Sequence, residues 1–79
     1  MTNREKYDEI FINVMEIKAE DLNEELKYNS ISLWDSVGHM QLIMELEANF
    51  DISIDTEDVL DFNSYFKGME ILKKYNVEI

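Results

Sequence analysis

The side chains best suited to chemistry in this 79-residue chain lie in one short stretch. Ser36 follows Asp35, and His39 comes three residues after Ser36. Residues three apart on a helix are neighbours, so the hydroxyl and the imidazole can approach each other. A nucleophilic serine also needs a base held by its own acid, and an oxyanion hole. The spacing supplies neither, so we expect no catalytic residue and expect His39 to be exposed or to face a partner.

The rest of the composition excludes most other site chemistry. There is no Cys, so the chain has no thiolate nucleophile and no disulfide. A single His makes a zinc site improbable, and we expect no metal site. Paired carboxylates such as Glu45 with Glu47 arise by chance among 18 acidic residues, and they are assigned no acid–base role. No glycine-rich phosphate loop is present.

Charge narrows the class of partner. The net charge is -11, and no Lys or Arg occurs between Lys27 and Lys67. Proteins bind the phosphates of nucleic acids mainly through Lys and Arg, so nucleic acid is not an expected partner. A surface of one sign steers oppositely charged partners and also keeps the protein in solution. No apolar run approaches membrane-spanning length, and no signal peptide is recognisable, so we expect a cytoplasmic protein without a membrane partner. We also expect a monomer.

The elements that position Ser36 are predicted to be helices, because apolar residues recur at helical spacing almost throughout. Asp35 is a suitable N-cap for a helix over 36–50, with Leu42, Ile43, Leu46 and Phe50 inside. Free N–H groups and the helix dipole favour anions at such a helix start, so a phosphodiester on Ser36 would be stabilised there. Ser is nevertheless common near helix starts, and this local signal alone is weak.

Three further helices complete an all-α bundle of one domain over residues 1–79. The first spans 3–17 after a Thr2/Glu5 capping box, and a loop of about 18 residues follows it. A short helix over 56–61 is capped by Asp55, and a last helix, capped by Asn63 or Ser64, reaches about Tyr75. The expected inward-facing residues outside the second helix are Tyr7, Ile10, Phe11, Val14, Met15, Leu22, Leu26, Ile31, Leu33, Phe66, Met69 and Leu72.

The wider register resembles the acyl carrier protein family. The attachment motif Asp-Ser-Leu of that family appears as Asp35-Ser36-Val37, and residues 40–52 resemble its second helix and the following turn. Residues 54–58 resemble the entry to its short third helix. The resemblance covers nearly the whole chain. One departure is Gly38 in the first turn of the helix, where glycine costs about 1 kcal/mol relative to Ala.

The resemblance implies a four-helix carrier with no catalytic activity of its own. Ser36 is then the attachment site of 4′-phosphopantetheine, which a phosphopantetheinyl transferase moves from coenzyme A, and Asp35 contacts that transferase. The arm carries acyl, aminoacyl or polyketide groups as thioesters, supplied by a loading ligase and used by synthases or transferases. The partner face implied by the resemblance comprises Val37, Met40, Gln41, Met44, Glu45 and Glu47.

Two other interpretations remain open on the sequence. The first is a small acidic helical interaction module that never receives an arm and uses the same helix only for docking. The second is a small enzyme built on Ser36 and His39. For Met44, packing in the core is as plausible as a place on the partner face.

Overall fold

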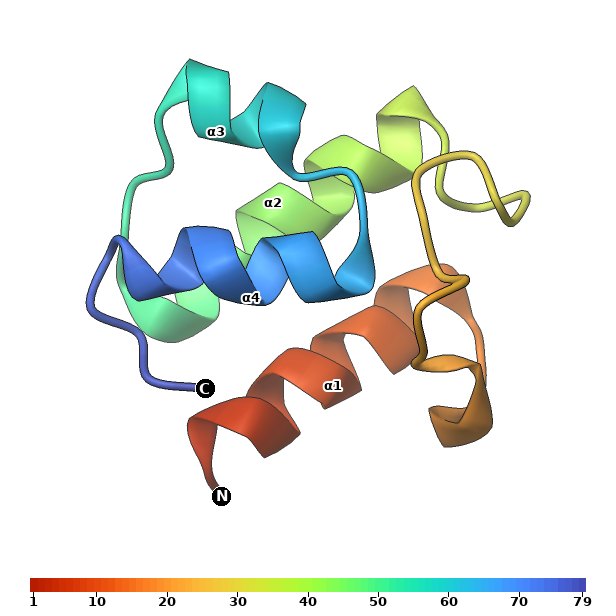
Figure 1. Ribbon diagram of the computed structural model, residues 1–79, viewed down its shortest axis with the longest axis horizontal. Helices are drawn as coiled ribbons and strands as arrows, with labels where there is room; N and C mark the ends of the chain where they lie inside the picture. Colours follow the sequence, from red (N-terminus) through yellow and green to blue (C-terminus); the bar gives the residue numbers. More distant parts are fainter.

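The computed structural model describes residues 1–79 and contains four α-helices and no β-strand. The helices are α1 (Asn3–Met15), α2 (Ser36–Phe50), α3 (Thr56–Asp61) and α4 (Tyr65–Lys73), with a short 3-10 turn at Ala19–Asp21. In Figure 1, α4 lies in front of α2, α1 runs below them, and α3 lies at the top. The predicted bundle of three main helices, one short helix and a long first loop is confirmed. None of the helices has the length and apolar character needed to cross a membrane.

Helix α1 begins as predicted and ends two residues early. Thr2 and Glu5 form the reciprocal capping box, in which each side chain accepts from the other's backbone N–H. At the other end Glu16 takes a left-handed backbone conformation with a φ of 55°, and its N–H returns to the carbonyl of Ile12. This left-handed residue terminates the helix after Met15, so the expected continuation to Ile17 is wrong.

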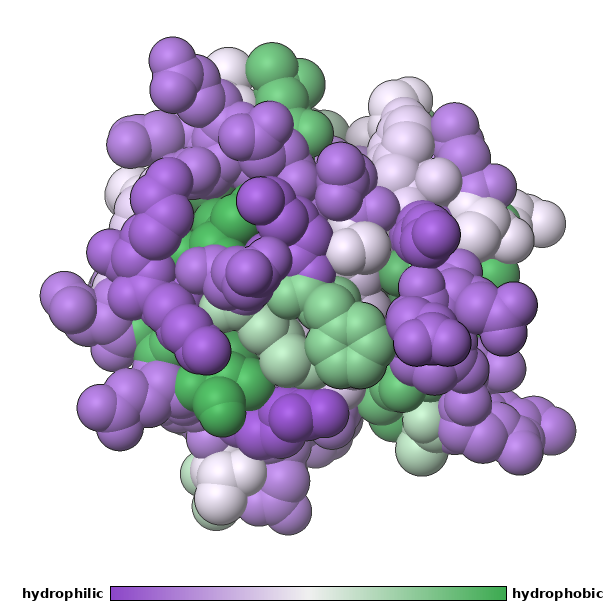
Figure 2. All heavy atoms as spheres, viewed as in Figure 1, coloured by the Kyte–Doolittle hydropathy of each residue, from purple (hydrophilic) through white to green (hydrophobic).

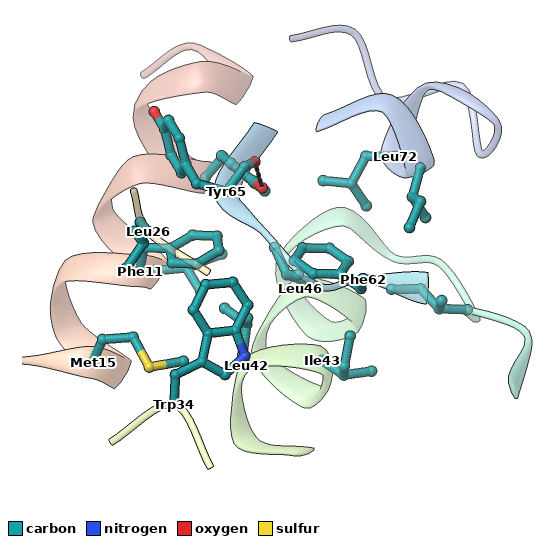
Figure 3. Packing of buried hydrophobic residues seen from close by; sticks show 14 of the residues in the cluster. Phe11, Met15, Leu26, Trp34, Leu42, Ile43, Leu46, Phe62, Tyr65 and Leu72 are labelled. Atoms are coloured by element: carbon teal, nitrogen blue, oxygen red, sulfur yellow. Dashed lines mark hydrogen bonds between the residues drawn. The ribbon is translucent and has the colours of Figure 1, made fainter. Parts of the chain in front are cut away.

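The core lies between the three longer helices and is rich in aromatic side chains. Figure 3 shows Phe11 of α1 and Trp34 of the loop pointing toward Leu42 and Leu46 of α2. The rings of Phe11 and Trp34 meet edge to face with centroids 5.3 Å apart. Phe50 and Val14, expected inside, are only half-buried. The buried apolar residues are Tyr7, Ile10, Phe11, Met15, Leu26, Trp34, Leu42, Ile43, Leu46, Ile54, Phe62, Tyr65, Ile71, Leu72 and Val77.

Of the four residues expected to hold the long first loop to the core, one is wrong, and a neighbour takes its place. Leu33 was predicted to point inward, but 41% of it is exposed, whereas the neighbouring Trp34 is completely buried. Adjacent side chains cannot both face the core at this point, and the indole buries far more apolar surface than a leucine would. Leu26 is buried as predicted, and Leu22 and Ile31 are half-buried against the core.

Helix α4 buries Leu72 as predicted and half-buries Met69, but one of its predicted inward residues is wrong. Phe66 was expected inside but is 48% exposed, and Tyr65 is buried in its place. The hydroxyl of Tyr7 donates to the carbonyl of Tyr65 at 2.6 Å, and the hydroxyl of Tyr65 donates to the carboxylate of Asp8. Burial, together with this bond to Asp8, raises the pKa of Tyr65 to about 12. The phenol therefore stays protonated and holds α4 against α1. The helix ends at Lys73, short of the expected Tyr75.

Helix α3 is fixed to the C-terminal end of α4 through Asp58. This carboxylate is buried, accepts from Lys74 Nζ at 2.6 Å and also accepts from the hydroxyl of Tyr75. The bonds from Lys74 and then Tyr75 lower the pKa of Asp58, so it remains charged and paired at neutral pH. Asp55 occupies the predicted N-cap position, but its side chain makes no capping hydrogen bond.

We predict that Trp34→Ala will destabilise the fold far more than Leu33→Ala. Loss of a fully buried tryptophan should cost about 3–5 kcal/mol of unfolding free energy. The adjacent, partly exposed Leu33 is the matched control and should cost much less. Urea unfolding followed by far-UV circular dichroism measures both. Equal losses for the two variants would contradict the assignment of Trp34 as the residue that holds the loop.

Candidate functional site

A turn over residues 29–34 directs the chain into the start of α2. Asn29 adopts a left-handed conformation with a φ of 68°, and its N–H donates to the carbonyl of Trp34 at 2.9 Å. The Ser30 hydroxyl donates to the carbonyl of Lys27 and accepts from the N–H of the same residue. With Trp34 buried beyond this turn, the two residues that follow are held at the surface.

The start of α2 has the predicted cap. Asp35 Oδ1 accepts from the N–H of Gly38 at 2.8 Å, and the Asp35 carbonyl accepts from the N–H of His39 at 2.8 Å. The structure also explains Gly38, which is unfavourable in a helix. A Cβ at this position would lie 1.7 Å from the carbonyl oxygen of Leu33. Only glycine allows the loop to approach the first turn of α2 so closely.

Ser36 is the first residue of α2 and is exposed beside three exposed apolar side chains. Val37 and Met40 follow it on the outer side of the helix, and Met44 lies one turn further along with 63% of its surface exposed. Packing of Met44 in the core is therefore excluded. Methionine and valine side chains at the surface next to a free hydroxyl form a contact area that can adapt to different partners.

The polar residues predicted for the partner face do not share one environment. Gln41 and Glu45 line an open groove of about 620 Å³ between α1 and α2. Glu47 instead turns toward the connection to α3, where its Oε2 accepts from the N–H of Ile54 at 2.9 Å. Glu47 therefore stabilises the connection between α2 and α3, whereas Glu45 is exposed and accessible to a partner.

His39 lies inside the protein, and the expectation that it is exposed or faces a partner is wrong. Only 9% of it is exposed. Its Nδ1 accepts from Trp34 Nε1 at 2.9 Å, and its Nε2 lies 2.8 Å from the carbonyl oxygen of Val59. Both ring nitrogens are engaged, so neither is left to take a proton from Ser36. This arrangement argues against a hydrolytic site.

Sequence reasoning missed one apolar residue of the surface near α2. Leu60 on α3 is 76% exposed, and Figure 2 shows apolar atoms protruding from an otherwise hydrophilic upper edge where α3 lies. A helix of six residues can bury only one side. Val59 of α3 and Phe62, which directly follows the helix, turn toward the core, and Leu60 between them faces solvent.

Charge on this side of the molecule is almost wholly negative. Residues 28–66, which include all of α2 and α3, contain no Lys or Arg. Two bases from other elements come close: Lys74 is paired with Asp58 of α3, and Lys6 of α1 lies in the groove that Met44 and Glu45 line. The exposed apolar residues of α2 and α3 thus lie on a segment whose own charges are all negative, and this combination fits a partner with a basic, partly apolar surface.

Comparison with known proteins finds relatives over nearly the whole length of the chain. The chain is 32% identical over 77 residues to the acyl carrier protein of Syntrophus aciditrophicus, covering 98% of this chain and 96% of that protein. It is 28% identical over 74 residues to the acyl carrier protein of Buchnera aphidicola, covering 94% and 92%. The acyl carrier protein of Chlorobium phaeobacteroides is 28% identical over 71 residues, covering 90% and 91%. No family model and no solved structure matches the chain.

We predict that Asp35→Ala will lower stability by about 1 kcal/mol, because the N–H of Gly38 loses its capping acceptor. Asp55→Ala is a matched control. It removes the same charge at the start of α3, where no capping bond is made, and it should cost clearly less. Chemical denaturation of both variants at one pH and salt concentration makes the comparison. A loss at Asp55 as large as that at Asp35 would show that charge, not the cap, accounts for the effect.

Proposed function

The chain belongs to the acyl carrier protein family, and we propose that it carries thioester-bound groups on a 4′-phosphopantetheine arm attached to Ser36. The observation that carries the proposal is the placement of Ser36, exposed at the first position of a 15-residue helix behind the Asp35 cap. The attachment motif of the family falls on Asp35-Ser36-Val37. The absence of Cys is consistent with a carrier whose reactive thiol belongs to its cofactor.

The residues around Ser36 are suited to receive such an arm. The arm joins a serine through a phosphodiester, and the free N–H groups at the start of α2 favour that negative charge. When bound, the arm supplies the thiol on which the carried group is held. Exposure of Ser36 leaves its hydroxyl accessible to a transferase, and the one nearby imidazole is committed to Trp34 and Val59. The chain thus acts as a carrier and not as an enzyme.

The partners we propose are enzymes that meet the carrier through α2. A phosphopantetheinyl transferase adds the arm from coenzyme A, a ligase loads an acyl or aminoacyl group, and synthases or transferases take that group over. Val37, Met40 and Met44 supply apolar contact, Gln41 and Glu45 flank them, and Glu47 lies at the edge near α3. The four helices share one core, in keeping with a single carrier domain over residues 1–79.

We predict that Ser36→Ala will abolish attachment of the arm while leaving the fold nearly intact, because Asp35 still caps α2. The matched control is Ser53→Ala, which changes another exposed serine outside the attachment motif. Each purified protein is incubated with a transferase and coenzyme A, and its intact mass is measured. A phosphopantetheine adduct is expected on the wild type and on Ser53→Ala only.

Two outcomes of this experiment would reject the proposal. An adduct on Ser36→Ala would place the attachment elsewhere. A folded wild type that accepts no arm from several transferases would favour the acidic interaction module that is never modified. Circular dichroism of each sample establishes that the protein tested is folded.

We predict that Glu45→Lys will slow association with the transferase by about tenfold at low salt, because exposed charges at a contact act mainly on encounter. Glu70→Lys, an equal charge change at an exposed position of α4, is the control and should have a much smaller effect. Glu47 is unsuitable because it also holds Ile54. Stopped-flow association at several salt concentrations measures the rates. Equal slowing by both variants would show that net charge, and not the α2 surface, determines encounter.

A further inference from the structure

The first turn of α2 is open to solvent on one side. Ser36 and Val37 are exposed, whereas Gly38 and His39 are buried. A Cβ on Gly38 would lie 1.7 Å from the carbonyl oxygen of Leu33, so the loop covers that side of the turn completely. On the remaining side the imidazole of His39 fills the space against α3. A group attached to Ser36 therefore starts from the open side and reaches the interior only past one of these two barriers.

The barrier at His39 is held in place by two hydrogen bonds. Its Nδ1 accepts from the indole N–H of Trp34 at 2.9 Å, and its Nε2 lies 2.8 Å from the carbonyl oxygen of Val59 in α3. Residues three apart on a helix are neighbours, so this ring is the first interior side chain on the way inward from Ser36. Displacing the ring would leave the indole N–H of the completely buried Trp34 without an acceptor, which is costly.

The core behind His39 consists of rings that fill it. The rings of Phe62 and Trp34 lie 6.1 Å and 6.2 Å from the imidazole between centroids. Phe11 meets Trp34 and Tyr65 edge to face, with centroids 5.3 Å and 5.5 Å away. Phe11, Trp34 and Phe62 have no exposed surface. Close-packed rings yield less readily to an inserted chain than flexible side chains such as methionine do.

Helix α3 is also prevented from moving away from α2. Asp58 accepts from Lys74 Nζ at 2.6 Å and from the hydroxyl of Tyr75. Glu47 of α2 accepts from the N–H of Ile54, just before α3, at 2.9 Å. An alkyl chain between the two helices would have to break the bridge through His39 against these bonds, and it has no polar atom to replace what is lost.

The groove between α1 and α2 does not shelter an apolar chain either. Four of its eleven lining residues are apolar, and Lys6 and Glu45 line the same groove of about 620 Å³. A chain lying in it would keep contact with water on its outer side and would take water away from charged groups. The same holds on the outer side of α2, where a chain over Met40 or Met44 has solvent on its other side.

We propose that the group carried on Ser36 stays outside the bundle, so that this carrier is suited to short or polar acyl groups, aminoacyl groups among them, and not to long alkyl chains. This inference rests on the proposed function of Ser36. A short or polar group loses little by remaining in water, whereas the cost of leaving an alkyl chain there grows with every methylene. A bundle whose interior is closed by His39 offers no place where that cost is reduced.

The first test compares acetyl and octanoyl groups on Ser36. A transferase attaches each acyl arm from its coenzyme A ester, and intact mass establishes one arm per molecule. A chain that binds inside the folded protein stabilises it, as any ligand of the folded state does. We expect the octanoyl form to melt within about 1 °C of the acetyl form. A Tm higher by about 4 °C or more with octanoyl would overturn the proposal.

Cleavage by hydroxylamine gives a second measurement on the same samples. Hydroxylamine attacks the thioester carbonyl, takes the acyl group as a hydroxamate and leaves the free thiol of the arm. Each rate is divided by that of the same acyl group on free pantetheine, so that intrinsic reactivity cancels. The acetyl and octanoyl quotients should agree within about twofold, because neither thioester is shielded. An octanoyl quotient lower by about fivefold or more would show a sheltered chain and contradict the proposal.

The matched variant is His39→Ala, which removes the ring and leaves an apolar space between α2 and α3. Apolar cavities of this kind bind apolar ligands, so octanoyl should raise the Tm of this variant by about 3 °C or more over acetyl. If His39→Ala does not fold, His39→Ser takes its place, because its hydroxyl keeps a hydrogen-bonding group at the position. The same small difference in the variant as in the wild type would overturn the assignment of His39 as the barrier.

A third measurement needs no transferase. The chain contains no Cys, so Ser36→Cys introduces a single thiol. Methyl and octyl methanethiosulfonate attach their alkyl groups to it as disulfides, with loss of methanesulfinate. The octyl group should raise the Tm over the methyl group only when His39→Ala is also present, and an equal rise with His39 in place would overturn the proposal. If the wild type accepts no arm, the proposed function fails, and this comparison still decides whether the bundle shelters a chain at position 36.

Discussion

Trp34 is completely buried directly before the residues that open α2, and much of the site depends on this one contact. Its indole packs on Phe11 of α1 and donates to the imidazole of His39. A chain that is anchored here must leave the core immediately afterwards, which places Asp35 and Ser36 at the surface. The close approach of the Leu33 carbonyl to Gly38 follows from the same anchoring. An exposed serine is thus held in position by a buried neighbour two residues away.

The short helix α3 buries few of its own residues and is held in place by a small number of polar contacts. Asp58 binds the end of α4 through Lys74 and Tyr75, Glu47 of α2 binds the N–H of Ile54, and His39 binds the carbonyl of Val59. Six residues make too few helical bonds to be stable alone, so α3 depends on these contacts.

The surface near α2 combines exposed apolar side chains with a surplus of acids. Val37, Met40 and Met44 are each at least half exposed, which is unusual for three neighbouring hydrophobic side chains. Residues 28–66 contain no Lys or Arg, so this segment offers no positive charge to another acidic protein. Mutual repulsion between copies disfavours self-association through such a surface. The same charge attracts basic partners from a distance, after which the apolar residues make the contact.

The sequence by itself determined the helices, their order and the start of α2, because helical periodicity and capping are local properties. Thr2 with Glu5, Asp35 with Gly38, and the range 36–50 could all be predicted from residues within one or two turns. Tertiary structure decided which neighbour faces inward where the periodicity is weak or the chain irregular. Trp34 is buried in place of Leu33, and Tyr65 in place of Phe66, because larger or hydrogen-bonding rings fill the available core. The environment of His39 also depended on tertiary structure, since Val59 lies 20 residues away and no local pattern brings it to the ring.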